Sequence, residues 1–392
     1  MVKVLIPEYL GQQVLSGIRS LYRNGDKCIL AGRSHGFLDK VFKSRAIWRF
    51  ADITPSSVDS HQYIQDIIGL NRREEFAFIL PFGLSSYYAV AKHAKELEPY
   101  TRFMVSPFSS FAIANDKLKT AQHCASLGII TPNTYSEYEE QDLASIANQI
   151  QYPVVIKARS GSGVRNRVFY ANNRQELYRY YQILFDNQDK TPGFEWKNPL
   201  IQEYIPGEIH DACTLSAKGE VITVLTQCRK MMYPVSGGVG ALNITTHNPS
   251  LAKLSKRLLE SLNWHGPAQI EFKFDPRDKQ YKLIEINPKL WGTLDLSIKA
   301  GVNFPVLIRN YLLEEKLKKD IPYPADVVYK FYFPQYTLAF LQLLLKSQFK
   351  SYSEKHKTLY RDFDPSDPRP DILRIIRTCA RILKGDWYKS RQ

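Results

Sequence analysis

The order of strand-like and helix-like segments is the feature that most constrains how this chain can fold. In the first 112 residues, apolar strands expected at 2–6, 28–31 and 77–80 alternate with amphipathic helices expected at 12–23 and 85–98. This alternation predicts an α/β domain in which helices cover a parallel sheet. No GxGxxG sequence follows the first strand and no Walker A sequence occurs, so neither a Rossmann dinucleotide site nor a P-loop is supported.

The pattern changes after a helix expected at 115–128, which ends at Gly128 shortly before Pro132. Strands then follow one another with few helices between them, which predicts antiparallel sheet in an α+β domain. These strands are expected at 152–157, 168–170, 200–203, 212–215, 221–226, 268–274 and 281–286. We therefore place a domain boundary near residue 113.

Basic charge accumulates at the end of the chain. The sequence has 53 Lys and Arg against 39 Asp and Glu, and its formal net charge of +14 favours an anionic partner without naming one. Residues 341–392 carry twelve of the basic residues against six acidic ones. Because no nucleic-acid-binding motif accompanies the charge, we expect no nucleic acid partner.

The last segment is expected to be a basic amphipathic helix that follows an Asp-Pro-rich loop at 362–370. Its apolar face has Ile372, Ile375, Ile376, Cys379 and Leu383, and its basic face has Arg374, Arg377, Arg381 and Lys384. The helix either packs on the body, which is the usual role of a C-terminal helix, or contacts an anionic membrane or polymer. We expect packing.

Cysteine spacing and the apolar runs bear on where the protein is found. The five cysteines are widely spaced without a CxxC pair, which indicates free thiols. The N-terminus reaches Glu8 and Gln12 too soon for a secretory signal, and the longest apolar run, at 336–345, is too short to span a bilayer. We expect a cytoplasmic protein, which would be membrane-peripheral if the final helix binds lipid.

Three oxygen-bearing side chains on two neighbouring strands predict a metal site. Glu285 and Asn287, in the sequence Leu-Ile-Glu-Ile-Asn-Pro, lie two residues apart and so share one face of a strand. Across an expected hairpin, Glu271 supplies a third ligand, and Mg²⁺ bound to phosphates prefers such carboxylate and amide oxygens. Taken alone, this pattern is equally typical of salt-bridged surface carboxylates.

Other segments have groups suited to the opposite side of a nucleotide. Lys157 ends an apolar strand and is followed by Ser160-Gly161-Ser162-Gly163, whose backbone N–H groups can approach phosphate closely. The sequence Gln202-Glu203-Tyr204-Ile205-Pro206-Gly207 is a strand entering a turn and suits an adenine edge. Glu208 or Asp211 is then placed to reach the ribose.

Together with Asn115-Asp116-Lys117 and Tyr152-Pro-Val-Val-Ile-Lys157, these segments resemble the ATP-grasp superfamily in order and spacing. The resemblance covers roughly residues 1–310 and is closest to the carbamoyl-phosphate-synthase-like and D-alanine-ligase-like carboxylate-amine ligases. It implies a Rossmann-like pre-ATP-grasp domain at 1–112, an ATP-grasp domain at 113–312 and a basic helical extension at 313–392. It also implies ATP, Mg²⁺ or alternatively Mn²⁺, and a homodimer.

The same resemblance implies roles for individual residues. Lys117 and Lys157 would neutralise the ATP phosphates, Glu203 would accept from the adenine amino group, and Glu208 is narrowly preferred over Asp211 for the ribose. The nucleotide-binding set is Lys117, Lys157, Ser160, Gly161, Ser162, Gly163, Glu203, Tyr204, Ile205, Glu208 and Asp211. The metal-binding set is Glu271, Glu285 and Asn287.

A second glycine-rich stretch, at 236–240, follows Arg229 and Lys230. By resemblance it closes over the γ-phosphate and the acceptor, whereas the alternative is an ordinary hairpin loop whose glycines adopt positive φ. Lys289 departs from the family, because related ligases usually have an Arg after the Asn-Pro pair, where it grips an oxyanion with two hydrogen bonds. Arg229, Lys230 and Lys289 are the catalytic candidates.

The reaction implied by the resemblance is ADP-forming ligation. A carboxylate attacks the γ-phosphate of ATP to give an acylphosphate, and an amine then displaces phosphate to form a C–N bond. An ATP-dependent phosphotransferase on the same fold and a non-catalytic ATP-binding protein are the alternatives. The N-terminal domain is expected to contribute contacts to the small-molecule substrates.

Overall fold

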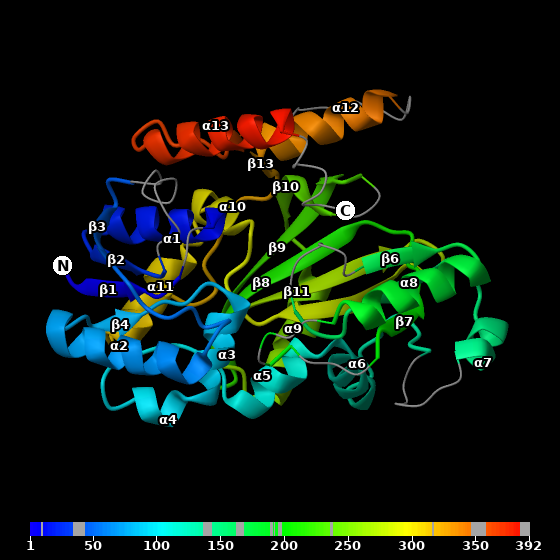
Figure 1. Cartoon of the computed structure of the whole chain (residues 1–392), viewed down its shortest axis with the longest axis horizontal. Helices are drawn as coiled ribbons and strands as arrows, with labels where there is room; N and C mark the ends of the chain where they lie inside the picture. The colour runs from blue at the N-terminus through cyan, green and yellow to red at the C-terminus, as the bar shows by residue number, and fades with distance from the viewer. Residues whose placement is uncertain are drawn as a thin grey trace.

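Three sheets organise the chain in the computed structural model (Figure 1). The residues described by the structure are 1–8, 11–33, 44–135, 143–161, 168–188, 191, 193–194, 198–235, 238–315, 317–345 and 358–384. A small parallel sheet lies at the N-terminal end, a seven-stranded sheet runs through the middle, and a three-stranded sheet lies beyond it.

The first sheet is parallel, as the alternation of strands and helices predicts. Its strand order is β3-β2-β1-β4. These strands are β1 (Lys3–Ile6), β2 (Lys27–Ala31), β3 (Ile47–Ala51) and β4 (Phe78–Ile79). Val4 and Leu5 are fully buried on opposite faces because helices cover both sides, as is usual for parallel sheet.

The helices around this sheet match the sequence prediction in part. The predicted helix at 12–23 is α1 (Gln12–Arg23), whereas the one predicted at 85–98 is split at His93 into α3 (Leu84–Lys92) and α4 (Ala94–Leu97). The sequence analysis missed α2 (Ser60–Glu74), which packs with α3 on the face opposite α1.

A capping residue determines where the next helices begin. The helix predicted at 115–128 consists of the end of α5 (Phe108–Asn115) and of α6 (Lys117–Ser126). Between them Asp116 has an extended backbone, and its Oδ1 accepts hydrogen bonds from the backbone N–H groups of Leu118 (2.9 Å) and Lys119 (3.4 Å). Asp is a preferred residue at this position, and here it makes Lys117 the first residue of α6.

The central sheet has the order β12-β11-β8-β9-β10-β13-β14, with every pair antiparallel except β13 and β14. Antiparallel sheet in this part of the chain is therefore confirmed. The strands are β8 (Ile209–Ala217), β9 (Glu220–Tyr233), β10 (Val239–Thr246), β11 (Gly266–Asp275), β12 (Gln280–Asn287), β13 (Val327–Lys330) and β14 (Thr358–Arg361). α9 (Pro249–Ser261), which the sequence analysis missed along with β10, packs on β8 and β9.

The three-stranded sheet has the order β6-β5-β7. Its strands are β5 (Val154–Lys157), β6 (Val168–Ala171) and β7 (Leu200–Glu203). Two helices that the sequence analysis missed, α7 (Leu143–Gln149) and α8 (Arg174–Asp186), pack against its apolar face, where Leu177 of α8 shares a core with Val154 and Ile156. Lys157 and Glu203 are the last residues of β5 and β7, and because these strands are antiparallel they lie at opposite ends of the pair, Lys157 opposite Leu200 and Glu203 opposite Val154.

The C-terminal part of the chain returns to the first sheet. α10 (Leu294–Lys299) and α11 (Phe304–Leu312) share one core with Val4, Ile6 and α1. After β13, the kinked segment η2 (Tyr332–Tyr336), in which Phe333 has an extended backbone, leads into α12 (Thr337–Leu345), and α13 (Arg369–Leu383) is the last described helix. Within the described residues, no helix is long and apolar enough to cross a membrane.

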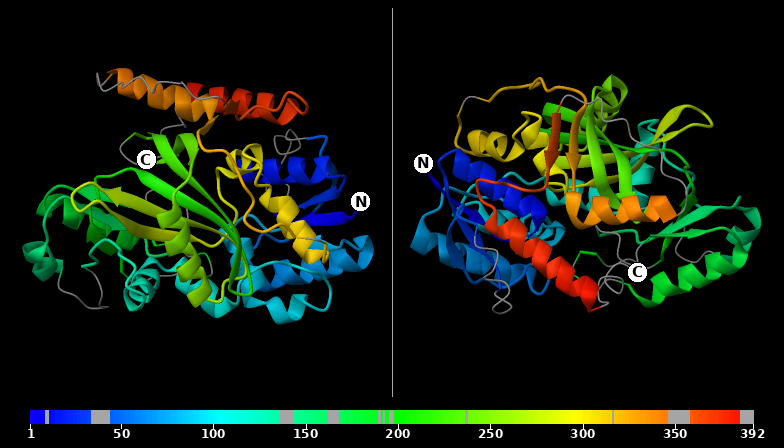
Figure 2. Two further views of the ribbon diagram at one scale, coloured as in Figure 1. Left: turned by 180° about the vertical axis from the view of Figure 1, so that it is seen from behind. Right: turned by 90° about the horizontal axis from the view of Figure 1, so that it is seen from above.

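The final helix packs on the body through polar contacts instead of its apolar face. Arg19 of α1 donates to Asp367 Oδ2 (2.9 Å) and to the buried Asp371 Oδ2 (3.0 Å). The predicted apolar face is largely in solvent, with Ile372 at 46% and Ile376 at 57% exposure. α12 and α13 form a layer at one edge of the molecule, away from the three-stranded sheet (Figures 1 and 2).

Candidate nucleotide and metal site

Glu271, Glu285 and Asn287 meet on one face of the β11–β12 hairpin. The strand register places Glu271 opposite Glu285, and Asn287 follows two residues later on the same face. Asn287 Nδ2 donates to Glu271 Oε1 (3.0 Å) and to Glu285 Oε1 (3.1 Å). The structure thus brings together the three side chains that the sequence analysis assigned to a metal.

The two carboxylates of this cluster differ in their electrostatic surroundings. Burial raises the pKa of Glu271 to about 7, although Arg229 opposes the rise. Burial also works against ionisation of Glu285, but the charges of Lys117 and Lys157 outweigh it and lower the pKa of Glu285 to about 2. The lysine charges therefore favour the ionised form of Glu285, whereas burial favours the protonated form of Glu271.

Two lysines face this cluster from other elements. Lys117, at the start of α6, has its Nζ 3.0 Å from Glu285 Oε2 and 3.3 Å from the carbonyl oxygen of Gly161. Lys157, at the end of β5, is 5% exposed, and burial together with the charge of Lys117 lowers its pKa to about 7. Two ammonium groups and two carboxylates therefore converge from three separate segments.

Hydrogen bonds hold the start of the predicted phosphate-binding loop, at Ser160 and Gly161, against neighbouring segments. The backbone N–H of Lys117 donates to the carbonyl oxygen of Arg159 (2.9 Å), and Ser160 Oγ donates to that of Phe194 (2.8 Å). Gly161 has φ +87°, a conformation that favours glycine. The rest of the predicted loop, Ser162 and Gly163, lies outside the described residues.

The segment expected to contact adenine follows β7. Glu203 ends this strand, and its carboxylate contacts Arg277 and lies 3.5 Å from Lys282 Nζ. Ile205 is buried, and its carbonyl oxygen accepts from Lys273 Nζ (2.7 Å), which also lies 5.1 Å from the centre of the Tyr204 ring. The Glu203 carboxylate is thus already paired with two cations, Lys282 on β12 and Arg277 in the β11–β12 turn.

The two ribose candidates lie in different environments. Asp211 is fully buried, and its carboxylate accepts hydrogen bonds from Arg229 (2.8 and 3.1 Å) and from Gln227 Nε2 (2.8 Å). Glu208 is half exposed and pairs with Lys230 Nζ (2.8 Å). Glu208 is therefore the one of the two that is open to a ligand.

Arg229 and Lys230 point to different faces of β9, because successive side chains of a strand alternate. Arg229 is wedged between Asp211 and Glu271, with its Nη2 2.8 Å from Asp211 Oδ1 and 2.5 Å from Glu271 Oε1. Lys230 lies beside Glu208. The pair that looks like one cationic unit in the sequence is therefore split.

The second glycine-rich stretch lies in a β-hairpin. Tyr233 of β9 pairs with Val239 of β10, and Ser236 and Gly237, which come between them in the sequence, lie outside the described residues. A Cβ on Gly238 would lie 2.2 Å from the carbonyl oxygen of Tyr233, so close backbone approach requires the glycine. Among the described glycines of this stretch, none has positive φ.

Sequence reasoning missed Glu8, which faces the site from the first sheet. Glu8 follows β1 and accepts a hydrogen bond from Ser86 Oγ at the start of α3. Burial raises its pKa to about 7, against the lowering effects of the Gly83 N–H group and the Lys289 charge. Burial lowers the pKa of Lys289, although the negative charges of Glu285, Glu271 and Glu8 act to raise it. A carboxylate just beyond the carboxyl end of a parallel strand was the available signal.

Family models match two overlapping parts of the chain. Residues 114–230 match the RimK-like ATP-grasp domain, and residues 195–330 match the ATP-grasp family described as belonging to a biosynthetic pathway with the Ter operon. The overlap covers β7, β8 and most of β9, which carry Glu203, Asp211 and Arg229. Both models therefore cover the segment that links the small sheet to the central sheet.

Curated relatives share less than a quarter of their residues with this chain over the matched regions. The chain is 24% identical over 251 residues to the carbamoyl phosphate synthase large chain of Saccharolobus islandicus, a match that covers 61% of this chain and 22% of the relative. It is 22% identical over 218 residues to the D-aspartate ligase of Enterococcus faecium, covering 50% and 49%. The match thus spans about a fifth of the length of the carbamoyl phosphate synthase chain and about half of that of the D-aspartate ligase.

Solved structures show the same fold at low sequence identity. The biotin carboxylase domain of Hydrogenobacter thermophilus 2-oxoglutarate carboxylase, a dimer in complex with MgADP, ADP and bicarbonate, has a TM-score of 0.65 and 17% identity, covering 83% of this chain and 73% of that one. The L-amino acid ligase of Bacillus licheniformis has a TM-score of 0.62 and 17% identity, covering 83% and 77%.

The fold and the site together define an ATP-grasp type of protein, with a small sheet and a larger antiparallel sheet enclosing lysines and carboxylates. Two ATP-grasp family models together match residues 114–330, in agreement with the resemblance of the motifs. Its relatives include ligases of the carbamoyl phosphate synthase and D-aspartate ligase kinds.

Proposed function

We propose that this chain is an ATP-dependent ligase that joins a carboxylate to an amine through an acylphosphate and releases ADP and phosphate. The observation that carries the proposal is the convergence of Lys117 and Lys157 on Glu285, beside Glu271 and Asn287. Phosphoryl transfer requires cations at the phosphates and oxygen ligands for a divalent ion, and this cluster has both.

Glu271, Glu285 and Asn287 fit Mg²⁺, and their oxygens suit Mn²⁺ as well. Two carboxylates share one buried site, where a divalent cation would offset both the burial and the Glu285 charge that raise the pKa of Glu271. Rotation of the Asn287 amide would turn its oxygen toward an ion held by both carboxylates. When bound, the ion supplies positive charge at the phosphoryl group that is transferred.

Lys117 and Lys157 would bind phosphate oxygens, which frees Glu285 for the metal. Ser160 and Gly161 begin the loop that would cover the triphosphate, together with Ser162 and Gly163. Glu203 would accept from the adenine amino group, with Tyr204 and Ile205 beside the ring. For the ribose we propose Glu208, because the oxygens of buried Asp211 are already bonded to Arg229 and Gln227.

The three candidate cations would have separate tasks. Arg229 positions Glu271 and balances its charge together with that of Asp211. Lys289 interacts electrostatically with Glu285, Glu271 and Glu8, so we propose that it faces the acylphosphate while Glu8 attracts a cationic part of a substrate. Lys230 would balance Glu208 at the ribose.

We also propose a division of the chain into three parts and assembly into a homodimer. Residues 1–112 would form the pre-ATP-grasp domain, 113–312 the ATP-grasp domain and 313–392 a basic helical extension, within a homodimer. The solvent-facing Ile376 and Leu383 of α13, with Arg381 and Lys384 nearby, support peripheral contact with an anionic membrane.

The decisive experiment measures ADP and inorganic phosphate after incubation with MgATP and pools of carboxylates and amines. A ligase releases both products only when carboxylate and amine are present, whereas a phosphotransferase releases ADP and keeps the phosphate on its product. The double variant Glu285→Ala, Asn287→Ala should lose activity in either case. Equal ADP release by the parent and the double variant would refute the metal assignment.

A further inference from the structure

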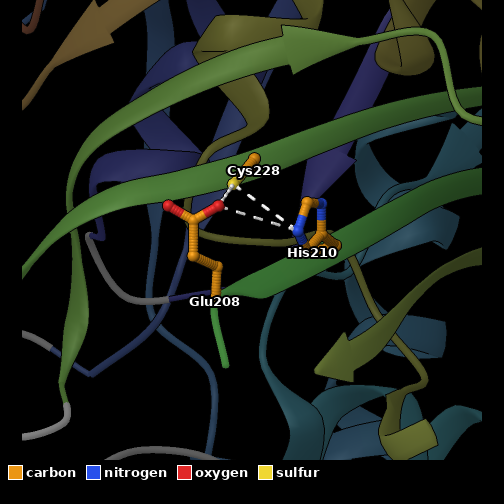
Figure 3. A group of neighbouring side chains, drawn as sticks. All are labelled: Glu208, His210 and Cys228. Atoms are coloured by element: carbon orange, nitrogen blue, oxygen red, sulfur yellow. Dashed lines mark hydrogen bonds and ion pairs between the residues drawn. The ribbon is translucent and has the colours of Figure 1, made fainter. Parts of the chain in front are cut away.

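Glu208, His210 and Cys228 form a cluster on one face of the β8–β9 pair, separate from the Glu271 cluster (Figure 3). Cys228 Sγ lies 3.6 Å from Glu208 Oε2 and 3.9 Å from His210 Nε2, and the same Glu208 and His210 atoms are 4.0 Å apart. One sulfur, one nitrogen and one oxygen atom thus face a common point.

These distances match the corners of a tetrahedral zinc site. Zinc bonds of about 2.3 Å to sulfur and about 2.0–2.1 Å to nitrogen or oxygen place neighbouring ligand atoms about 3.3–3.6 Å apart. The three separations in the cluster exceed these values by about 0.7 Å at most. Small side-chain movements would therefore complete the geometry.

The strand pairing holds two of the three ligands in place. His210 of β8 is the direct register partner of Cys228 of β9. Cys228 is fully buried, and the His210 ring packs edge-on against Tyr281 with 5.3 Å between ring centres. Glu208 is half exposed, so it supplies the movable ligand and leaves the site open to solvent.

The nature of the donors selects the ion. Thiolate and imidazole are ligands for Zn²⁺, whereas Mg²⁺ prefers the oxygen atoms found at the Glu271 cluster. The nearest competing cation is Lys230, whose Nζ lies 2.8 and 3.0 Å from the two Glu208 oxygens. Binding of an ion would require this lysine to release Glu208.

We propose that Glu208, His210 and Cys228 bind one Zn²⁺ ion and leave its fourth position to water. On binding, the zinc–sulfur bond replaces the S–H bond of Cys228, and the proton passes to solvent. Because Glu208 is also the proposed ribose contact, Zn²⁺ would compete with MgATP. The metal site stands on the geometry alone, whereas this competition rests on the proposed function.

The test measures Zn²⁺ binding to the full-length protein, stripped of metal, by competition with a chromogenic chelator. We expect one Zn²⁺ per chain at this site, and at least about tenfold weaker binding in Cys228→Ser and in His210→Gln. Cys379→Ser, which alters the exposed thiol on α13, should bind as the parent does. Co²⁺ in the parent should give a thiolate-to-cobalt absorption band that Cys228→Ser lacks.

Lys230→Met provides a readout that a damaged fold would not give. It should bind Zn²⁺ more tightly than the parent, because Glu208 loses its competing partner. Unchanged Zn²⁺ affinity in folded Cys228→Ser, verified by circular dichroism, would overturn the site. If Zn²⁺ binds through Cys228 but MgADP affinity is unaffected by Zn²⁺, the metal site stands and the assignment of Glu208 to the ribose fails.

Discussion

Lys117 Nζ lies 3.0 Å from Glu285 Oε2, so the first residue of α6 neutralises a carboxylate near the end of β12. In the proposed function this lysine would bind the phosphates and leave Glu285 to bind the metal. Glu285→Gln keeps the size of the side chain and removes its charge. It should lower kcat/KM for MgATP at least about 100-fold, because a metal-assisted step loses several kcal/mol.

The matched control is Glu220→Gln, at a surface residue that pairs with Lys319. It makes the same chemical change, and it should leave turnover and metal dependence as in the parent. Equal loss in both variants would mean that Glu285 acts only through overall charge.

Nucleotide binding should take up a proton at Lys157. Burial lowers the pKa of Lys157 to about 7, so at pH 8 most chains carry this amine neutral. Phosphate oxygens beside it favour the charged form and raise its pKa. Calorimetry of MgADP binding at pH 8, in buffers with different ionisation enthalpies, should show proton uptake in the parent. Lys157→Met should abolish it, whereas Lys119→Met on the exposed side of α6 should not.

Arg229 is expected to contribute more to stability than its neighbour Lys230. Arg229→Met leaves Asp211 and Glu271 buried without their shared cation and should cost about 3–5 kcal/mol of unfolding free energy. Lys230→Met breaks a pair with half-exposed Glu208 and should cost less than about 1 kcal/mol. Urea unfolding followed by circular dichroism measures both, and equal costs would contradict the role given to Arg229.

Local periodicity explains which parts of this site could be predicted from the sequence. Glu285 and Asn287 share a face because residues two apart in any strand do so, and a hairpin brings Glu271 opposite them. The helix at 12–23 was predicted with its bounds because its apolar residues recur at helical spacing. β3, at Ile47–Ala51, was missed because its middle residues are exposed and lack an apolar alternation.

Partners distant in the sequence could not be predicted. Arg229 meets Glu271 only because β8 lies between β9 and β11, and the sequence does not specify that strand order. Glu8 and Lys289 come close because residues after β12 fold back onto the first sheet. The exposure of Ile376 follows from the Arg19 contacts of α13, which helical periodicity alone does not reveal.

Stability should depend on pH through His265. Burial, with a smaller effect of the Lys218 charge, lowers the pKa of His265 from 6.5 to about 4. The unfolded state therefore binds a proton between these pH values when the folded state does not. The stability contribution is complete above pH 6.5 and is lost as pH falls toward 4, by roughly 3 kcal/mol. His265→Gln should flatten this dependence, whereas His247→Gln at an exposed site should retain it.

Arg381 and Lys384 of α13 are expected to mediate binding to anionic membranes. Truncation of the tail is a poor test, since it would also remove Asp367 and Asp371, which hold Arg19. Arg381→Ser with Lys384→Ser keeps those contacts. At about 1 kcal/mol per basic residue, this change should weaken sedimentation with phosphatidylserine vesicles about 20–30-fold at low salt.

The control for this prediction is Lys253→Ser with Arg257→Ser on α9, which lies away from α13 and changes the net charge equally (Figure 1). If the net charge of the protein alone drives membrane contact, the two double variants will bind equally weakly. If the exposed face of α13 is responsible, α9 substitution leaves binding close to that of the parent. Adding Ile376→Asn to the α13 variant should then remove binding that persists at high salt, because apolar insertion is not screened.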